Sequence, residues 1–188
     1  IPPHNLGEVA EALVALIDDP DLGIDGLMEY VKSPDFPTGG IIYGISGVKE
    51  AYKTGRGHIH IRARAHLETL KNGREDIVVT EIPYMVAKSN LLEKMADLVR
   101  DKRIAGIGNI RDESDREGMR IVVEVKRDGN GEVILNQLYR FTQLEATFAA
   151  NLIALVGGQP KRLNLKELLE CFIDHRHEVV VRRTQYEL

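Results

Sequence analysis

The sequence of 188 residues contains no tryptophan, a single cysteine and few aromatic residues, which make up 5% of the chain. One cysteine, Cys171, can form neither an internal disulfide nor a cysteine-rich metal site. No apolar run reaches the roughly 18 residues that a membrane-spanning helix requires. These absences favour a reducing, cytoplasmic setting.

Neither sign of charge dominates, because 25 Lys and Arg residues stand against 29 Asp and Glu residues and leave a net charge of −4. This mild acidity excludes a protein that binds nucleic acid through bulk charge alone, but it is compatible with a local basic surface. The apolar share of 43% is that of a protein with a hydrophobic core. At this length we expect one ordinary domain or two small ones.

The two ends of the sequence predict a fragment. The chain begins with Ile1-Pro2-Pro3 rather than with methionine, and the helical pattern at its end has no Gly or Pro to stop it. We therefore expect cuts through continuous structure at both ends.

The spacing of apolar residues predicts an α+β fold. Asn5 is a good N-cap for the first helix. Predicted helices cover 6–17, 24–31, 89–103 (with Ser89 or Asn90 as cap), 132–140 and 165 to the end, with a helical turn at 48–52. Predicted strands cover 41–45, 57–67, 76–82, 107–111 and 119–125, and the apolar run 148–156 fits either a strand or a helix. A turn at 71–74 makes 57–67 and 76–82 a hairpin.

From 76 to 156 the expected order is strand, helix, strand, strand, helix, strand. This is the ferredoxin-like split βαββαβ order, in which two helices cover one face of an antiparallel sheet. A long C-terminal helix follows it.

The most basic part of the chain is 49–64, where five Lys or Arg residues and one Glu give a local charge of +4. The turn 54–57 offers free backbone N–H groups and an Arg, which suit a phosphate. Arg62 and Arg64 lie two positions apart, roughly 6.5–7 Å along one strand face, close to the spacing of neighbouring phosphates. The alternative is a solvated sheet face with crossed ion pairs. Acidic residues cluster separately, over 18–35.

Other candidate sites are weaker. Three histidines of the basic strand suggest a metal, but the neighbouring arginines would repel a cation. The stretch 112–117 has paired carboxylates, as magnesium and acid–base sites do, yet Arg111 and Arg116 favour a salt-bridged turn. We find no nucleophile with its base, no metal-ligand spacing and no nucleotide fingerprint.

Long motifs along the chain are similar to one family. They are Ile1-Pro2-Pro3-His4-Asn5-Leu6, Pro34-Asp35-Phe36-Pro37-Thr38-Gly39-Gly40, Tyr52-Lys53-Thr54-Gly55-Arg56-Gly57, Glu81-Ile82-Pro83-Tyr84, Arg111-Asp112-Glu113-Ser114-Asp115-Arg116, Gly118-Met119-Arg120-Ile121, Gly158-Gln159-Pro160-Lys161 and Arg182-Arg183-Thr184. Together they resemble the A subunits of bacterial type IIA DNA topoisomerases, that of DNA gyrase first and that of topoisomerase IV next. The resemblance implies a lead-in from a winged-helix domain over 1–40, the tower domain over 41–160 and the start of a coiled coil over 161–188.

The family's activity is implied by the resemblance alone. In this family, A subunits dimerise, bind and bend a gate duplex, cut both strands through tyrosyl–DNA links and let a second duplex pass. The implied partners of the full protein are double-stranded DNA, a second copy of the same polypeptide and the B subunit, through which ATP and Mg²⁺ act. The catalytic tyrosine lies upstream, so we expect a monomeric fragment without catalytic residue, metal or cofactor of its own.

Ile1 matches the isoleucine that in this family wedges between base pairs and kinks the gate duplex. An apolar wedge unstacks a base step at a cost of roughly a few kcal/mol, which the contacts of bent DNA offset. The expected phosphate contacts are Arg56, Arg62 and Arg64, with Lys49, Lys53, Thr54 and, ahead of a helix, Lys88 as weaker candidates. Binding should be weak, sensitive to salt and indifferent to sequence.

Two other functions compete with DNA binding. A free-standing interaction module would use the acidic segment 18–35 and the C-terminal helix to bind a protein. A metal hydrolase built on Asp112, Glu113 and Asp115 is disfavoured, because no histidine ligand or nucleophile is near in the sequence.

Overall fold

The computed structural model describes residues 1–70 and 73–188, and the chain forms two compact units. Unit 1 contains Ile1–Phe36, Gly44–Ile59 and Ala149–Leu188, and unit 2 contains Pro37–Tyr43 and His60–Phe148. At two of the points where the chain passes from one unit to the other, it does so within a strand, in β2 (Arg56–Arg62) and in β7 (Glu145–Asn151). These two units differ from the three consecutive segments 1–40, 41–160 and 161–188 that the family resemblance implies. The three-segment division remains a prediction.

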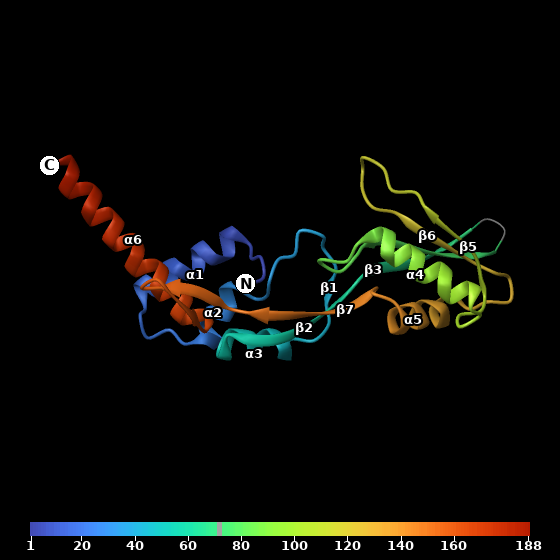
Figure 1. Ribbon diagram of the computed structural model, residues 1–188, viewed down its shortest axis with the longest axis horizontal. Helices are drawn as coiled ribbons and strands as arrows, with labels where there is room; N and C mark the ends of the chain where they lie inside the picture. Colours follow the sequence, from blue (N-terminus) through green and yellow to red (C-terminus); the bar gives the residue numbers. More distant parts are fainter. Residues whose placement is uncertain (71–72) are drawn as a thin grey trace. The chain divides into compact units, whose positions relative to one another are not determined.

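Unit 1 is largely helical (Figure 1). Its elements are α1 (Leu6–Asp18), α2 (Ile24–Tyr30), α3 (Ser46–Thr54), α6 (Leu165–Glu187) and the hairpin of β8 (Ile153–Val156) and β9 (Gln159–Arg162). The Asn5 side chain accepts hydrogen bonds from the backbone N–H groups of Gly7 and Glu8, which confirms the predicted start of α1. A capping box of Asn164 and Glu167 opens α6.

Two glycines let α3 lie directly on the backbone of β2. A Cβ atom on Gly47 would overlap the carbonyl oxygen of His58, and one on Gly57 would overlap the carbonyl oxygen of Gly47 and meet the Ala51 nitrogen at 2.7 Å. Any side chain at either position would force the helix and the strand apart. The buried Val48, Ala51 and Tyr52 complete this packing.

Unit 2 is an antiparallel sheet in the order β3-β4-β6-β5 (Arg64–Thr69, Glu75–Glu81, Ile121–Val125, Ile107–Asp112). The helices α4 (Lys88–Arg100) and α5 (Gly131–Phe141) contribute to one hydrophobic core with one face of this sheet (Figure 1). The core holds Ile77, Val79, Ile121 and Val123 from the strands and Leu91, Met95, Leu98, Ile134 and Leu138 from the helices. The apolar spacing in the sequence predicts an inner stripe for α4 of Leu91, Leu92, Met95, Leu98 and Val99, and this is confirmed, because Leu92 and Val99 pack against the same core.

Charged side chains occupy the other face of this sheet. Arg120 donates to both carboxylate oxygens of Glu68 and also to Glu113, which holds the pKa of Glu68 at about 2. Beneath them Val78 and Val122 are fully buried. Polar side chains with apolar stems thus lie over an apolar centre on this face.

The predicted α+β class, the antiparallel sheet and the long final helix are confirmed. The single strand 57–67 is wrong, because β2 ends at Arg62 and β3 begins at Arg64 in another sheet. The cause lies at Ala63, whose N–H donates to the Leu144 carbonyl oxygen (2.7 Å) and whose carbonyl oxygen accepts from the Tyr139 hydroxyl (3.0 Å). The predicted basic face is therefore divided between two sheets: His58, His60 and Arg62 belong to one, and Arg64 and His66 belong to the other.

The elements follow the expected order from β4 to β7, but β7 does not close the split sheet. It pairs with β2 in a sheet of order β1-β2-β7, where β1 is Ile41–Ile42, and β3 takes the place beside β4. Helix α4 begins after Ala87, so neither Ser89 nor Asn90 caps it. The run 148–156 is strand, divided between β7 and β8. The β3–β4 hairpin is confirmed, although residues 71 and 72 of its predicted turn lie outside the described residues.

Candidate nucleic-acid interface

The turn between α3 and β2 is fixed by its own hydrogen bonds. Gly55 ends α3 in the left-handed region (φ 76°). The Thr54 hydroxyl oxygen lies 2.9 Å from the Glu50 carbonyl oxygen and 2.8 Å from that of Arg56, and it accepts from the Arg56 N–H at 3.2 Å. The Thr54 hydroxyl is therefore committed to the turn, and it holds the backbone that carries Arg56.

Two of the predicted contacts in unit 1 are free cations. Lys49 and Arg56 are exposed, and across residues 1–70 and 73–188 neither side chain has an ion-pair partner. Lys53 instead pairs with Asp25 at 3.0 Å. A free cation can take up a phosphate without first giving up a carboxylate.

Sequence reasoning missed Arg162, a residue of β9 whose side chain lies against this turn. A Cβ atom on Gly55 would lie 2.7 Å from the Arg162 Cγ atom, so the stem of Arg162 runs directly past the turn. The only signal in the sequence was the family-like motif 158–161, which ends just before it.

Arg62, in unit 2, is built into a cluster of side chains. Its Nε donates to Glu145 at 2.5 Å, and its guanidinium carbon lies 3.8 Å from the Tyr43 ring centroid and 5.2 Å from that of Tyr139. The hydrogen bond with Glu145 raises the pKa of Arg62 further. DNA binding by Arg62 stays a prediction, and a phosphate would have to compete with Glu145.

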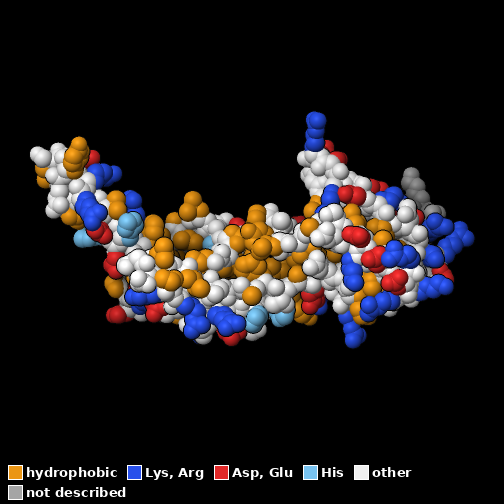
Figure 2. Space-filling model, viewed as in Figure 1, with side chains coloured by type: hydrophobic (Ala, Val, Ile, Leu, Met, Phe, Trp, Pro, Cys, Tyr) orange, Lys and Arg blue, Asp and Glu red, His pale blue; other side chains and the backbone are white. Residues whose placement is uncertain are grey.

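Arg64 and Lys88 are also paired with carboxylates. Arg64 contacts Glu81 at 3.0 Å, and the pKa of Glu81 is lowered first by the Gly40 N–H and then by Arg64. Lys88 contacts Asp112 at 2.6 Å and, with Ser114, holds the pKa of Asp112 at about 2. Over α4, β5 and β6, Lys and Arg side chains are interspersed with Asp and Glu (Figure 2). The crossed ion pairs of the alternative interpretation are therefore present in unit 2.

Ile1 stands at the tip of a fixed segment. Its side chain is 62% exposed, while Pro2 is buried behind it. The Pro3 carbonyl oxygen accepts from the Asp35 N–H at 2.9 Å, and the Asn5 amide donates to the Asp35 carboxylate at 3.3 Å. An exposed apolar residue on a rigid base has the form that a wedge requires.

His4 ties this tip to α3. Its Nδ1 lies 2.9 Å from the Pro2 carbonyl oxygen and its Nε2 lies 2.8 Å from the hydroxyl of Tyr52, which is fully buried. Burial lowers the pKa of His4 and raises that of Tyr52. Because a carbonyl only accepts, Nδ1 of the neutral ring carries the proton and the Tyr52 hydroxyl donates to Nε2.

The paired carboxylates of 112–117 form a salt-bridged turn, as the sequence favours, but its cations are Arg111, Arg120 and Lys88, whereas Arg116 has no ion pair among the described residues. Asp112 accepts from Ser114 and pairs with Lys88, and Glu113 pairs with Arg111 and Arg120. Within the part of the chain that the structure describes, no group of three or more His, Cys, Asp or Glu side chains could hold a metal ion. The arrangement offers neither a free base nor a metal ligand set.

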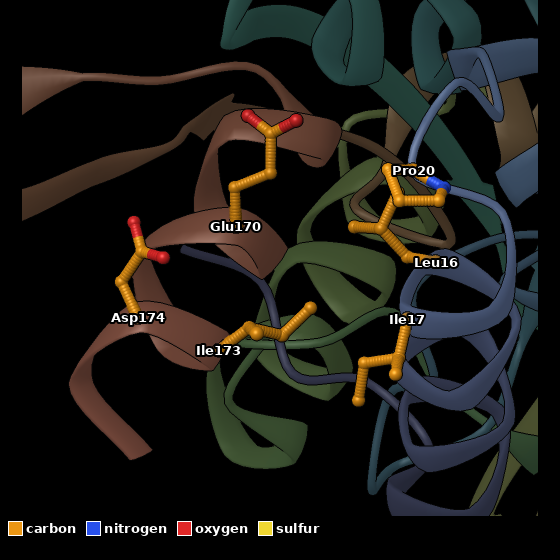
Figure 3. A pocket seen from close by; sticks show the side chains of 6 residues that line it. All are labelled: Leu16, Ile17, Pro20, Glu170, Ile173 and Asp174. Carbon is orange, nitrogen blue, oxygen red and sulfur yellow. The ribbon is translucent and has the colours of Figure 1, made fainter. Parts of the chain in front are cut away.

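A hollow of about 260 Å³ lies between α1 and α6 in unit 1 (Figure 3). Ile173 extends toward α1, where Leu16, Ile17 and Pro20 form the opposite wall. Glu170 and Asp174 stand on the α6 side. This is where the competing hypothesis of a protein-interaction module would place its partner, because the hollow is lined by the C-terminal helix and by residues next to the acidic segment 18–35.

The family model for the A subunit of DNA gyrase/topoisomerase IV matches residues 1–188, which is the whole chain. The chain belongs to this family. It is 57% identical to the DNA gyrase A subunit of Pseudomonas aeruginosa, 58% to that of Escherichia coli K12 and 54% to that of Clostridium acetobutylicum. Each comparison covers 100% of this chain and 21%, 22% and 23% of the relative, so the chain spans about a fifth of the length of these relatives.

Membership of the gyrase and topoisomerase IV family confirms the resemblance drawn from the motifs. It does not test the individual residues, whose roles therefore remain proposals. Along the described residues, each helix is too short or too polar to cross a membrane.

Proposed function

We propose that this chain is a DNA-binding part of the breakage-reunion subunit of a cytoplasmic type IIA topoisomerase. It holds the gate duplex through phosphate contacts and bends it with the Ile1 wedge. The full enzyme contains two copies of the breakage-reunion polypeptide, and its B subunit supplies ATP and Mg²⁺. It passes a duplex through the gate to supercoil or decatenate DNA. The chain by itself is a monomer and cleaves no DNA.

The observation that carries this proposal is a pair of exposed cations, Lys49 on α3 and Arg56 in the turn after it, which have no ion-pair partner among the described residues. Each phosphate that such a cation neutralises releases condensed counterions, so binding strengthens as salt falls. Because the contacts are with the backbone, affinity is independent of base sequence.

We expect Arg56→Ala to lower the salt dependence of binding more than Arg62→Ala does. Removing one phosphate contact reduces the slope of log affinity against log salt by about 1, whereas Arg62 is already neutralised by Glu145. The measurement is fluorescence anisotropy of a short labelled duplex between about 50 and 200 mM salt. Lys94→Ala is the matched control, because Lys94 is also exposed and has no ion-pair partner in the described part of the chain.

Equal affinity of the unaltered chain at both salt concentrations would contradict phosphate binding. If binding to a protein partner persisted in excess duplex, the interaction module would be favoured instead.

Ile1→Ala should reduce duplex bending, measured by energy transfer between dyes on the two ends, and leave the salt slope unchanged.

A further inference from the structure

The β8–β9 hairpin is a short ribbon with a defined register. Ile153 lies opposite Arg162, and Leu155 lies opposite Pro160. Its turn is Gly157-Gly158, with φ values of 60° and 78°. Positive φ at both turn positions is the geometry that matches the twist of a two-stranded ribbon. The ribbon therefore has two well-defined faces.

One face of this ribbon is apolar and exposed. Leu155 is 75% exposed and Ile153 is 47% exposed, and both share a face with Pro160 and Arg162 because residues two apart and their cross-strand partners point the same way. All four residues of β9 are exposed. An exposed apolar ribbon of this kind marks a binding surface.

The charge of the hairpin selects the partner. From 151 to 166 the sequence has three cations, Lys161, Arg162 and Lys166, and no Asp or Glu, in a chain whose net charge is −4. Lys161 and Arg162 have no ion-pair partner among the described residues, whereas Lys166 donates to the Pro20 carbonyl oxygen. A partner for this surface is anionic.

The base of the hairpin is joined to the turn that carries Arg56. The Leu152 N–H donates to the Gly55 carbonyl oxygen at 2.8 Å, and the Leu163 N–H donates to the Leu152 carbonyl oxygen at 2.9 Å. Arg162 runs past Gly55. Arg56 and Arg162 thus belong to one basic surface of unit 1.

We propose that the β8–β9 hairpin is a second DNA-binding element, which lies in a groove of the duplex with Leu155 and Ile153 against sugars and base edges. Arg162 and Lys161 bind the phosphates on either side. Two-stranded ribbons fit the grooves of DNA, and apolar side chains are used there as contacts or wedges. This inference rests on the proposed function and adds an element to it.

The test compares Leu155→Ser and Arg162→Ala in the same duplex-binding measurement, together with hydroxyl-radical footprinting of the duplex. Leu155→Ser should bind roughly tenfold more weakly at every salt concentration, because an apolar contact is lost. Arg162→Ala should lower the salt slope by about 1. With each variant, a few sugars of the duplex that the unaltered chain protects from hydroxyl radicals should be cleaved.

Leu155→Thr, which keeps a residue suited to strands, guards against loss of the hairpin itself. Val180→Ser, at an exposed valine of α6, is the matched control and should bind like the unaltered chain. Unchanged binding and an unchanged footprint for Leu155→Ser and Arg162→Ala, while Arg56→Ala weakens binding, would overturn the hairpin proposal alone. Failure of the unaltered chain to bind duplex would overturn the proposed function with it.

Discussion

Gly47→Ala is expected to destabilise unit 1 by more than about 3 kcal/mol, because a methyl group there overlaps a carbonyl oxygen. The obstacle is the backbone of His58 in β2, which cannot rotate away as a side chain could. Helix α3 would have to leave the strand, and Val48 and Tyr52 would lose their packing. Since α3 carries Lys49 and ends at the Arg56 turn, DNA binding should fall together with stability.

Urea unfolding followed by hydrogen exchange at amides of unit 1 measures this effect separately from unit 2. Gly23→Ala is the matched control in the same unit: a Cβ atom there meets nothing within 4 Å, and φ is −79°. As an N-cap change it should cost at most about 1 kcal/mol. A Gly47→Ala protein as stable as the Gly23→Ala protein would show that α3 does not contact β2 in this way.

Tyr52→Phe is expected to cost about 1–3 kcal/mol, since it leaves the half-buried Nε2 of His4 without its donor while keeping the ring. The same change should reduce duplex bending, because His4 no longer holds the Pro2 carbonyl oxygen and the Ile1 tip in one orientation. Thermal unfolding and dye-to-dye energy transfer measure the two effects. Loss of stability with full bending would contradict the role of His4 in positioning Ile1.

The burial of His4 beside Tyr52 also predicts that the stability of the folded chain depends on pH. Burial lowers the pKa of folded His4 below 6.5, so the unfolded chain binds more protons as pH falls through that value. Stability is therefore full above about 6.5 and is lost as the pH drops from there toward the folded pKa. His4→Gln, which keeps a donor and an acceptor but does not titrate, should remove this part of the pH dependence.

Local signals in the sequence predicted most individual elements. Asn5 before an apolar periodicity set the start of α1, and the stripe of α4 followed from Leu91, Met95 and Leu98. The break at Ala63 could not be predicted, because its neighbours keep the alternation of a single strand. It depends on Leu144 and Tyr139, which reach Ala63 only in the folded chain.

The candidate site shows the same limit. Charge counting located the basic segment 49–64, but it could not tell free cations from paired ones. Glu145, Glu81 and Asp25 come from distant parts of the sequence and neutralise Arg62, Arg64 and Lys53. Arg162 reaches the Gly55 turn from further still.

The two units also differ in when they can fold during synthesis. Unit 2 is almost continuous, so its sheet and helices are available once residue 148 has left the ribosome. Unit 1 needs Ala149–Leu188 to meet segments made before unit 2, so its contacts are distant in sequence and form late. In a released chain that ends at residue 148, unit 2 should therefore resist protease while α1 is still digested.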